Sequence, residues 1–362
     1  MKALLLSQIG VAQEIIDDLD VDLPLDHEVL VRTCACGVCH SDLHFRQGKW
    51  STFPLPLVLG HEVAGIVEKV GSQVTYLKPG DHVVGCLTAF CGECDYCLSG
   101  RMYLCAGTGL GRGSERRPRL QRKGKPVSQF VNLSGFAEMM LVHERALVRI
   151  DDDIPLDVAA VVGCAVTTGM GAVFNTAQVR PGETVAVFGC GGVGLNVIQA
   201  ARITGAGRII AVDRSPAKAE AARAYGATDV VIADDTAVGR ILDMTGGGVD
   251  HAFEAVGLSA TAQAAFETLR AGGTATIVGL LPQGAKISVD STALTFDRRL
   301  RGSNMGSNRF RIDIPRYLQM YRDGRLKIDE LITARIGLED VDEALLTLET
   351  GDGITRSVAI FD

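Results

Sequence analysis

The sequence predicts an α/β protein in which a doubly wound parallel sheet is joined to a second, mostly β domain. From about residue 165, strand-like apolar runs alternate with alanine-rich helical segments; the runs are ETVAVFG, RIIAVD, DVVIA, VDHAFEAV and TATIVGL. This alternation is typical of a parallel sheet covered by helices on both faces. The first 150 residues instead carry short strand-like runs separated by glycine and proline turns, which is typical of a compact β domain.

The predicted domains follow from where this pattern changes. A chain of 362 residues with 47% hydrophobic content can hold two domains. After Gly302 the pattern is mixed, with helical segments near IPRYLQMYRDG and LEDVDEALLTLETG and a last strand RSVAIF. We expect the chain to return there to the first domain, leaving a cleft between the two. The mostly β domain is predicted over 1–164 and 305–362, and the parallel-sheet domain over 165–304.

Composition excludes several functional classes. A net charge of −7 argues against a general nucleic-acid binder. The opening MKALLLSQIG is a better strand than signal peptide, and no uninterrupted apolar stretch approaches the roughly 18 residues that span a bilayer. Ten cysteines in a chain of this length indicate metal binding in a reducing compartment and not a disulfide framework. We expect a cytoplasmic protein with neither a nucleic-acid nor a membrane partner.

One basic segment departs from the acidic balance. Its cations are Arg112, Arg116, Arg117, Arg119, Arg122, Lys123 and Lys125. The favoured interpretation is a solvated, extended loop. The alternative is that these cations steer an anionic cofactor or substrate toward a nearby cleft.

Four closely spaced cysteines predict a metal site. They are Cys91, Cys94, Cys97 and Cys105, in the run CGECDYCLSGRMYLC. Four thiolates suit a tetrahedral site for zinc or an iron–sulfur centre. Because a fully ligated zinc has no open position, this lobe, at about 88–110, is expected to be structural.

A glycine-rich turn predicts a dinucleotide site. Gly189, Gly191, Gly192, Val193 and Gly194 belong to a G-x-G-x-x-G pattern between a predicted strand and a helix. Such glycines permit a close approach to pyrophosphate at the helix N-terminus. The next strand ends in Asp213, 19 residues after Gly194, and a carboxylate there would bind ribose hydroxyls and repel a 2′-phosphate. NAD is therefore favoured over NADP. Arg214 and Lys218 are predicted beside the adenosine half, and the favoured interpretation of Arg214 is a surface arginine near the adenine edge.

A second ligand set is predicted from Cys39, His61 and Cys164. Two thiolates and an imidazole would leave the fourth position of zinc open. The three residues are scattered over 125 positions, so spacing alone does not bring them together. The competing thiols are Cys34, Cys36, Cys86 and Cys190.

The run GHEVAGIVEKVGSQV, from Gly60 to Val74, resembles the zinc signature of the medium-chain alcohol dehydrogenases. The Cys39 motif, the four-cysteine lobe, the Cys164 segment and the glycine-rich turn follow in that family's order. The resemblance, which is closest to the long-loop, class III-like branch, implies a GroES-like catalytic domain and a Rossmann coenzyme domain. It also implies a catalytic zinc on Cys39, His61 and Cys164 and a structural zinc on the four-cysteine lobe.

The resemblance assigns further roles in catalysis. Ser41 resembles the hydroxyl that contacts the zinc-bound alcohol, and His44 the histidine that ends a proton relay through the nicotinamide ribose. Asp42 resembles the carboxylate that orients the ligand histidine. Glu62 resembles the carboxylate behind the zinc that can tune ligation. Ser41 and Asp42 could instead cap the helix after Cys39.

The resemblance also implies coenzyme contacts. Thr168, Val193 and Val278 should lie near the nicotinamide, although both valines could equally be core residues. Arg356 resembles an arginine that grips the pyrophosphate. His40 and Leu258 stand where several family members have arginine, which indicates weaker coenzyme binding.

The expected function is the NAD-linked, zinc-dependent oxidation of primary alcohols, aromatic or medium-chain, to aldehydes by hydride transfer. One alternative is a thiol-dependent formaldehyde dehydrogenase that acts on S-hydroxymethyl-glutathione or -mycothiol. Alternatives of other kinds are a non-catalytic zinc and nucleotide-binding module and a metal-free reductase of quinones or enones. The long segment from Ala106 to Gly135 resembles that of dimeric branches, so we expect a homodimer.

Overall fold

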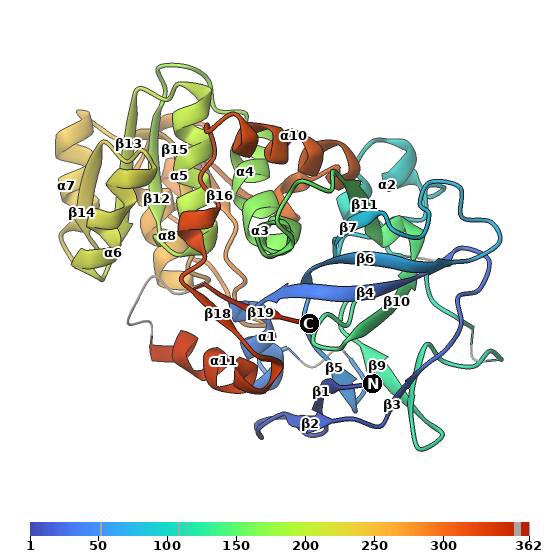
Figure 1. Cartoon of the computed structure of the whole chain (residues 1–362). Coiled ribbons are helices and arrows are strands. Elements are labelled where there is room, and N and C mark those ends of the chain that lie inside the picture. The colour runs from blue at the N-terminus through green and yellow to red at the C-terminus, as the bar shows by residue number, and fades with distance from the viewer. Residues whose placement is uncertain (51–52, 108, 114, 351–355, 362) are drawn as a thin grey trace. The chain divides into compact units, whose positions relative to one another are not determined.

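A computed structural model describes residues 1–50, 53–107, 109–113, 115–350 and 356–361, without the side chains of 349 and 350. The chain divides into two compact units. Unit 1 comprises Met1–Cys164, Arg309–Arg322 and Ile328–Asp362, and unit 2 comprises Ala165–Asn308 and Asp323–Lys327. Figure 1 shows the course of the chain through both units.

Unit 1 is built around β4 (Glu28–Gly37), which pairs antiparallel with β6 (Glu62–Val70). The sheet order is β11-β7-β6-β4-β19-β18, and β10 also pairs with β4. The remaining strands of this sheet are β7 (His82–Gly85), β10 (Met139–His143), β11 (Leu147–Ile150), β18 (Ala334–Ile336) and β19 (Ser357–Ile360). Because β19 lies antiparallel to β4, the C-terminal segment completes a sheet begun near the N-terminus (Figure 1).

A second sheet of unit 1 has the order β2-β1-β5-β9-β8-β3. Its strands are β1 (Ala3–Leu6), β2 (Glu14–Ile16), β3 (Leu19–Val21), β5 (Leu57–Val58), β8 (Leu120–Arg122) and β9 (Lys125–Gln129). The helices of unit 1 are α1 (His40–Arg46), α2 (Asp95–Leu98), α3 (Leu156–Val161), α10 (Phe310–Arg322) and α11 (Val341–Thr350). Apolar side chains from both sheets share one buried core, as expected for the mostly β fold that the sequence predicts.

Unit 2 is a parallel six-stranded sheet with the order β14-β13-β12-β15-β16-β17. The strands are β12 (Thr184–Phe188), β13 (Arg208–Asp213), β14 (Asp229–Ile232), β15 (Val249–Glu254), β16 (Leu269–Ile277) and β17 (Arg299–Gly302). The helices are α4 (Thr167–Gly171), α5 (Gly192–Thr204), α6 (Pro216–Ala221), α7 (Ala237–Thr245), α8 (Ser259–Glu267) and α9 (Ser291–Thr295). This strand order is that of the Rossmann fold, in which a ligand binds at the carboxyl ends of the strands where the order reverses. The predicted doubly wound sheet is confirmed.

One helical run, Leu156–Ala177, is long and apolar enough to cross a membrane by length and composition. The sequence analysis did not predict it, because Gly and Thr residues interrupt its apolar positions. Its most apolar 18-residue window is 89% buried within the protein. A core helix explains this composition without a membrane.

Candidate functional site

The pairing of β4 with β6 brings the first two predicted zinc ligands together. Gly37 lies opposite Glu62 in the register, so Cys39, just past the end of β4, comes close to His61, just before β6. Cys164 is supplied by the helical run that follows α3. The ligand atoms of Cys39, His61, Glu62 and Cys164 all lie within 4.8 Å of one another. None of the competing thiols is part of this cluster or of the four-cysteine cluster.

Asp42 fixes the orientation of His61. The Asp42 carboxylate is fully buried, and its Oδ1 lies 3.2 Å from His61 Nδ1. It also accepts hydrogen bonds from the backbone N–H groups of Gly60 (3.1 Å) and Cys39 (3.3 Å). With Nδ1 occupied, His61 Nε2 is buried and makes no hydrogen bond within the described chain. Against the lowering effect of burial, the charges of Asp42 and Cys39 raise the pKa of His61. In its neutral form, an imidazole held in this way presents a lone pair at Nε2, as a metal ligand must.

The two thiols of the cluster influence each other's ionisation. A hydrogen bond from Cys164, with the charge of His61, holds the pKa of Cys39 well below its ordinary value. The same hydrogen bond to Cys39, together with burial, raises the pKa of Cys164. Since a divalent cation requires both sulfurs as thiolates, the donor set of two thiols and an unpaired imidazole nitrogen fits zinc.

Glu62 lies beside the cluster and is held by Arg356. One guanidinium nitrogen, Nη1, lies 2.8 and 2.9 Å from the two carboxylate oxygens. Burial raises the pKa of Glu62 to about 8, against the lowering effect of the Arg356 charge. Arg356 is 9% exposed, and its guanidinium is engaged by Glu62. Its predicted contact with a pyrophosphate stays a prediction.

Helix α1 carries the predicted proton relay. Cys39 caps its N-terminus, and Asp42 accepts from the Cys39 backbone, so the capping role of Asp42 coexists with its contact to His61. His44 is half-buried, and its Nδ1 makes no hydrogen bond among the described residues. Burial, with the charges of Lys49 and His40, lowers the pKa of His44. Ser41 is half-buried and His40 exposed on the same helix.

An ion pair that the sequence analysis missed anchors the far end of α1. Arg46 is 7% exposed, and its Nε and Nη2 donate to the two oxygens of Asp342, in α11, at 2.7 and 2.9 Å. The backbone and side-chain amides of Gln13 also donate to Asp342. No local sequence signal joins residues 296 positions apart, so only the fold reveals this pair.

The four-cysteine cluster has the dimensions of a tetrahedral zinc site. The sulfur–sulfur distances are 3.9 Å from Cys91 to Cys97, 3.6 Å from Cys94 to Cys97 and 3.9 Å from Cys94 to Cys105. A tetrahedron with zinc–sulfur bonds of about 2.3 Å has edges of about 3.8 Å. Backbone N–H groups also donate to the sulfurs of Cys91 and Cys105, which stabilises thiolates.

The glycine-rich turn lies between β12 and α5 at the reversal of strand order. A Cβ on Gly194 would lie 1.7 Å from the carbonyl oxygen of Gly189, so no larger residue fits there. Asp213, at the end of the neighbouring β13, accepts from the backbone N–H groups of Cys190 (2.8 Å) and Ser215 (2.9 Å). The carboxylate therefore lies beside the turn, as the dinucleotide prediction requires. Arg214 is exposed and Lys218 half-buried nearby.

The predicted nicotinamide contacts are distributed over unit 2. Thr168 lies in α4, and its hydroxyl is 3.3 Å from the sulfur of Met305. Val193 is the second residue of α5, and Val278 follows β16 directly. Both valines are partly buried, so their burial does not separate a coenzyme contact from a core position.

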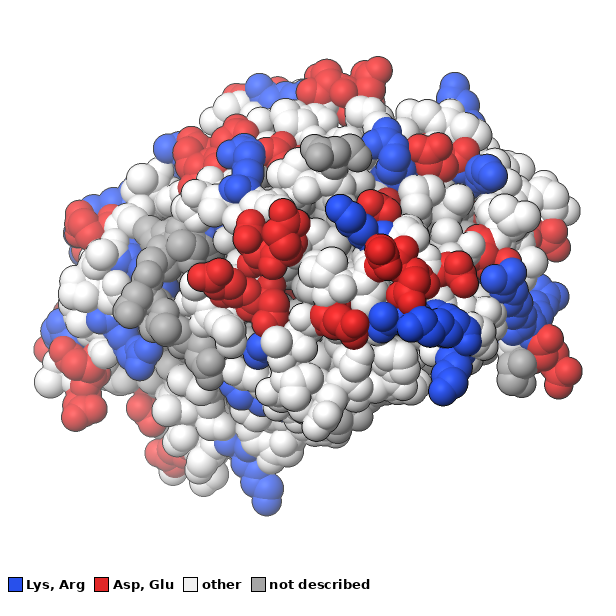
Figure 2. Space-filling view, turned by 60° about the horizontal axis from the view of Figure 1, so that its bottom comes forward, with Lys and Arg blue, Asp and Glu red and all other residues white. Residues whose placement is uncertain are grey.

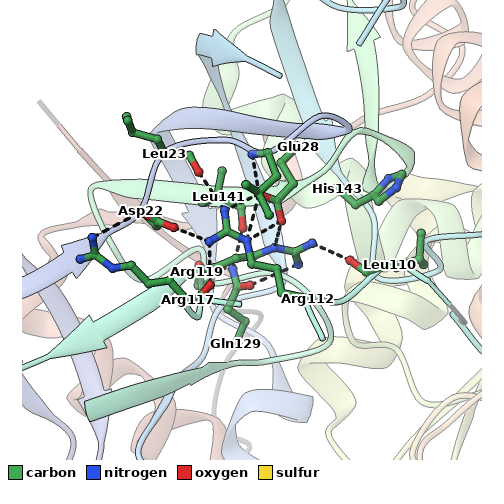
Figure 3. A network of polar contacts seen from close by, with 12 residues as sticks. Asp22, Leu23, Glu28, Leu110, Arg112, Arg117, Arg119, Gln129, Leu141 and His143 are labelled. Atoms are coloured by element: carbon green, nitrogen blue, oxygen red, sulfur yellow. Dashed lines mark hydrogen bonds and ion pairs between the residues drawn. The ribbon is translucent and has the colours of Figure 1, made fainter. Parts of the chain in front are cut away.

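The basic segment is only in part the solvated loop that was favoured. Figure 3 shows Arg112 and Arg119 converging on Glu28, which is 4% exposed. Arg112 also pairs with Asp22, and Arg122 pairs with Asp18 and Glu14. Arg116, Lys123 and Lys125 remain exposed, and Figure 2 shows lysine and arginine interspersed with acidic side chains over the visible face. These ion pairs hold the segment against β4. They could not be predicted from the sequence, because the partners are far apart in the chain.

Comparison with known proteins identifies the family. Residues 25–152 match the alcohol dehydrogenase GroES-like domain, and residues 192–322 match the zinc-binding dehydrogenase family. The class-3 alcohol dehydrogenase of Pisum sativum is 38% identical over 356 residues, which cover 96% of this chain and 94% of the pea protein. This chain belongs to the zinc-dependent alcohol dehydrogenases. Within this family the four-cysteine cluster and the Cys39–His61 cluster fit two zinc sites, and the chain is an oxidoreductase with a nucleotide cofactor.

Other zinc-dependent dehydrogenases resemble the chain over nearly its whole length. The S-(hydroxymethyl)glutathione dehydrogenase of Saccharomyces cerevisiae is 38% identical over 349 residues, covering 93% of this chain and 90% of the yeast protein. The benzyl alcohol dehydrogenase structure from Acinetobacter calcoaceticus has a TM-score of 0.92 at 31% identity, covering 100% and 99% of the two chains. A zinc-binding dehydrogenase of Sinorhizobium meliloti bound to NADP has a TM-score of 0.79 at 28% identity, covering 99% of each chain.

Proposed function

We propose that the protein is a zinc-dependent, NAD-linked dehydrogenase that interconverts a CH–OH group and a carbonyl. The observation that carries this proposal is the convergence of Cys39, His61 and Cys164, with the unpaired His61 Nε2 buried among the ligand atoms. Unit 1 is assigned as the catalytic domain and unit 2 as the coenzyme domain. We retain the cytoplasmic homodimer as a prediction.

NAD is preferred over NADP because of Asp213. Its carboxylate is fixed by two backbone N–H groups beside the glycine-rich turn, where it would accept from ribose hydroxyls and repel a 2′-phosphate. The NADP-bound relative has 28% identity, which leaves room for a different coenzyme. Arg214 is exposed next to Asp213 and is the residue through which NADP would be tolerated.

The chain's own residues supply orientation and a proton path. Zinc, when bound, supplies Lewis acidity that lowers the pKa of an alcohol oxygen. Asp42 holds His61 in the ligating tautomer. Ser41 and His44, three residues apart on α1, share one face of the helix. With the coenzyme bound, Ser41 Oγ would accept the substrate's hydroxyl proton, and His44 would be the final acceptor, because its lowered pKa keeps the ring neutral and able to accept a proton at pH 7.

The substrate proposed first is the S-hydroxymethyl adduct of a low-molecular-weight thiol such as glutathione. Its support is the similarity to proteins named class-3 alcohol dehydrogenase and S-(hydroxymethyl)glutathione dehydrogenase, at 38% identity over more than nine-tenths of the chain. The reaction is then hydride transfer from the adduct's carbinol carbon to the nicotinamide.

A simple primary alcohol, aromatic or medium-chain, is the second candidate. Two observations favour it. The benzyl alcohol dehydrogenase structure matches the whole chain, and the arginines that could have bound the carboxylates of an anionic thiol are in part already paired with acidic side chains of this chain, as Arg112, Arg119 and Arg122 show.

Metal analysis and a substrate comparison test these proposals. We expect two zinc ions per chain, and one zinc with no turnover in Cys39→Ser. Formaldehyde oxidation with NAD that occurs only with glutathione or mycothiol supports the adduct. Benzyl alcohol turnover without any thiol supports the second candidate instead. One zinc and no turnover with either substrate would contradict the dehydrogenase proposal.

A further inference from the structure

A buried carboxylate that the proposed reaction does not use lies in the coenzyme domain. Glu254 ends β15 and is fully buried. Its Oε1 accepts from the backbone N–H groups of Val256 (2.9 Å) and Gly257 (2.7 Å), and the Thr261 hydroxyl lies 2.7 Å away. Its Oε2 makes no hydrogen bond within the described part of the chain. Burying a carboxylate among neutral donors costs free energy, so a specific role for Glu254 is expected.

Glu254 joins two turns at the carboxyl edge of the sheet. Its side chain organises the turn 255–258, and its backbone carbonyl accepts from the N–H groups of Val278 (2.8 Å) and Gly279 (2.9 Å), directly after β16. A Cβ on Gly279 would lie 2.3 Å from the Gly257 nitrogen and 2.7 Å from Glu254 Oε2. The two turns are therefore in direct contact through this one residue.

The first of these turns also contacts the glycine-rich turn. The Ala255 N–H donates to the carbonyl of Phe188, the last residue of β12 (2.8 Å). A Cβ on Gly189 would lie 2.7 Å from a methyl carbon of Val256. A displacement of the turn 255–258 would therefore also displace the glycine-rich turn, which is the proposed pyrophosphate site.

The surface around these turns suits one half of a dinucleotide. In a doubly wound sheet each half of the strand order binds one mononucleotide, and Asp213 places the adenosine half over β12 and β13. The other half falls to β15 and β16. There Val256, Leu258 and Leu280 are 46, 53 and 37% exposed. Exposed apolar side chains at a strand edge provide contact area for a flat ring.

We propose that Glu254 is a positioning residue for the nicotinamide half of the coenzyme. Glu254 fixes the 255–258 turn against Val278. The apolar surface and the backbone that would contact the nicotinamide half are therefore already in position before the coenzyme binds. The inference rests on the proposed use of NAD(H). It assigns Glu254 no contact with the coenzyme, because its side chain is fully buried.

Three substitutions in the zinc-loaded enzyme test the role of Glu254. Glu254→Gln keeps the shape and removes the charge, and Thr261→Val removes one donor. Thr268→Val is the matched control, because Thr268 is also buried at the same helix, α8, where its hydroxyl donates to Ala265 (2.8 Å) and not to Glu254. Binding of NADH, followed by nucleotide fluorescence, is compared with binding of AMP, which is the adenosine mononucleotide half alone.

We expect Glu254→Gln to weaken NADH binding about tenfold, the effect of weakening charge-assisted hydrogen bonds. Thr261→Val should also weaken NADH binding, while both variants bind AMP within about twofold of wild type. Thr268→Val should bind both nucleotides as wild type does. No separate rescue variant is needed, because Thr261→Val tests the hydrogen bond while the Glu254 carboxylate is still present.

Two results would overturn the inference while leaving the proposed function intact. One is unchanged NADH binding in Glu254→Gln and Thr261→Val. The other is an equal loss of NADH and AMP affinity, or the same loss in Thr268→Val, since either would indicate general loosening of unit 2. A wild-type enzyme that does not bind NADH overturns both the inference and the proposed use of NAD(H).

Discussion

At the scale of single residues, buried carboxylates in unit 1 have distinct partners and distinct effects. Asp42 faces a histidine and two backbone N–H groups, Glu62 faces Arg356, and Glu28 faces Arg112 and Arg119. Each is nearly excluded from water, so its partner decides whether its charge is stabilised.

Replacing Asp42 by asparagine should weaken zinc binding at the Cys39–His61 cluster. Asparagine can still accept from the Gly60 N–H, but it no longer provides the charge that orients His61. We expect about a 10- to 100-fold loss of affinity for one of the two zinc ions, measured by competition with a chelator. Asp313→Asn, at a buried carboxylate that accepts from the Arg309 N–H in α10, is the control. Equal zinc retention in both variants would contradict the orienting role.

Glu28 should make unit 1 acid-sensitive. Hydrogen bonds from Arg112 and Arg119, with one from Leu25, lower the pKa of Glu28 from 4.5 to about 2 against the effect of burial. Because its pKa is lower in the folded state, ionised Glu28 stabilises the folded protein at pH values above its unfolded pKa of 4.5. This stabilisation is lost as the pH falls from 4.5 to about 2. Glu28→Gln should therefore unfold with a free energy about 3 kcal/mol lower than wild type at pH 7.

The difference between wild type and Glu28→Gln should shrink as pH falls below 4.5, in urea unfolding followed at several pH values. Glu68→Gln is the control, because Glu68 is 40% exposed and pairs with Arg32 at the surface; its effect should stay below about 1 kcal/mol. A Glu28→Gln deficit that is the same at pH 7 and pH 3 would argue against the ionised carboxylate as its cause.

At the scale of elements, helix α1 is a short helix held at both ends. Its N-terminus is fixed by Cys39 and Asp42, and its last residue, Arg46, by the two-point contact to Asp342 of α11. A seven-residue helix has little stability of its own. These contacts, and not helix propensity, therefore keep Ser41 and His44 in place.

Asp342→Asn should destabilise the protein by about 2 kcal/mol, because it leaves Arg46 buried without its counter-charge. Denaturant unfolding measures the loss, and turnover should fall as the relay residues lose their fixed position. Arg32→Lys, at the exposed pair with Glu68, should change stability by less than about 0.5 kcal/mol. Indistinguishable stabilities of the two variants would show that the α1 anchor is no stronger than a surface pair.

At the scale of the whole molecule, features set by local spacing could be predicted from the sequence. The alternation of strands and helices gave the parallel sheet, and the four-cysteine spacing gave a cluster whose sulfurs do lie close together. The pairs Arg46–Asp342 and Arg119–Glu28 could not be predicted, because their partners are 296 and 91 residues apart. Glu254 gave no signal either, since nothing local distinguishes a buried glutamate from an exposed one at a strand end.

The four-cysteine lobe should contribute to stability and not to chemistry. Cys97→Ser should lose one zinc, retain the other and retain turnover, while its melting temperature falls by about 5–10 °C because the metal contributes folding free energy. Cys34→Ser, at a half-buried thiol outside both clusters, should melt within about 2 °C of wild type. Loss of turnover in Cys97→Ser at a temperature where the variant stays folded would assign the lobe a catalytic part.

The pairing of β19 with β4 also sets an order of events during synthesis. Val358 lies opposite Gly37, so the end of β4 that leads into Cys39 waits for a partner strand made roughly 320 residues later. At about 5–20 residues per second, that interval is some tens of seconds. Until β19 has been synthesised, the end of β4 that leads into Cys39 lacks its partner on that side. We therefore expect the segment around Cys39 to reach its final geometry late in the maturation of the newborn protein.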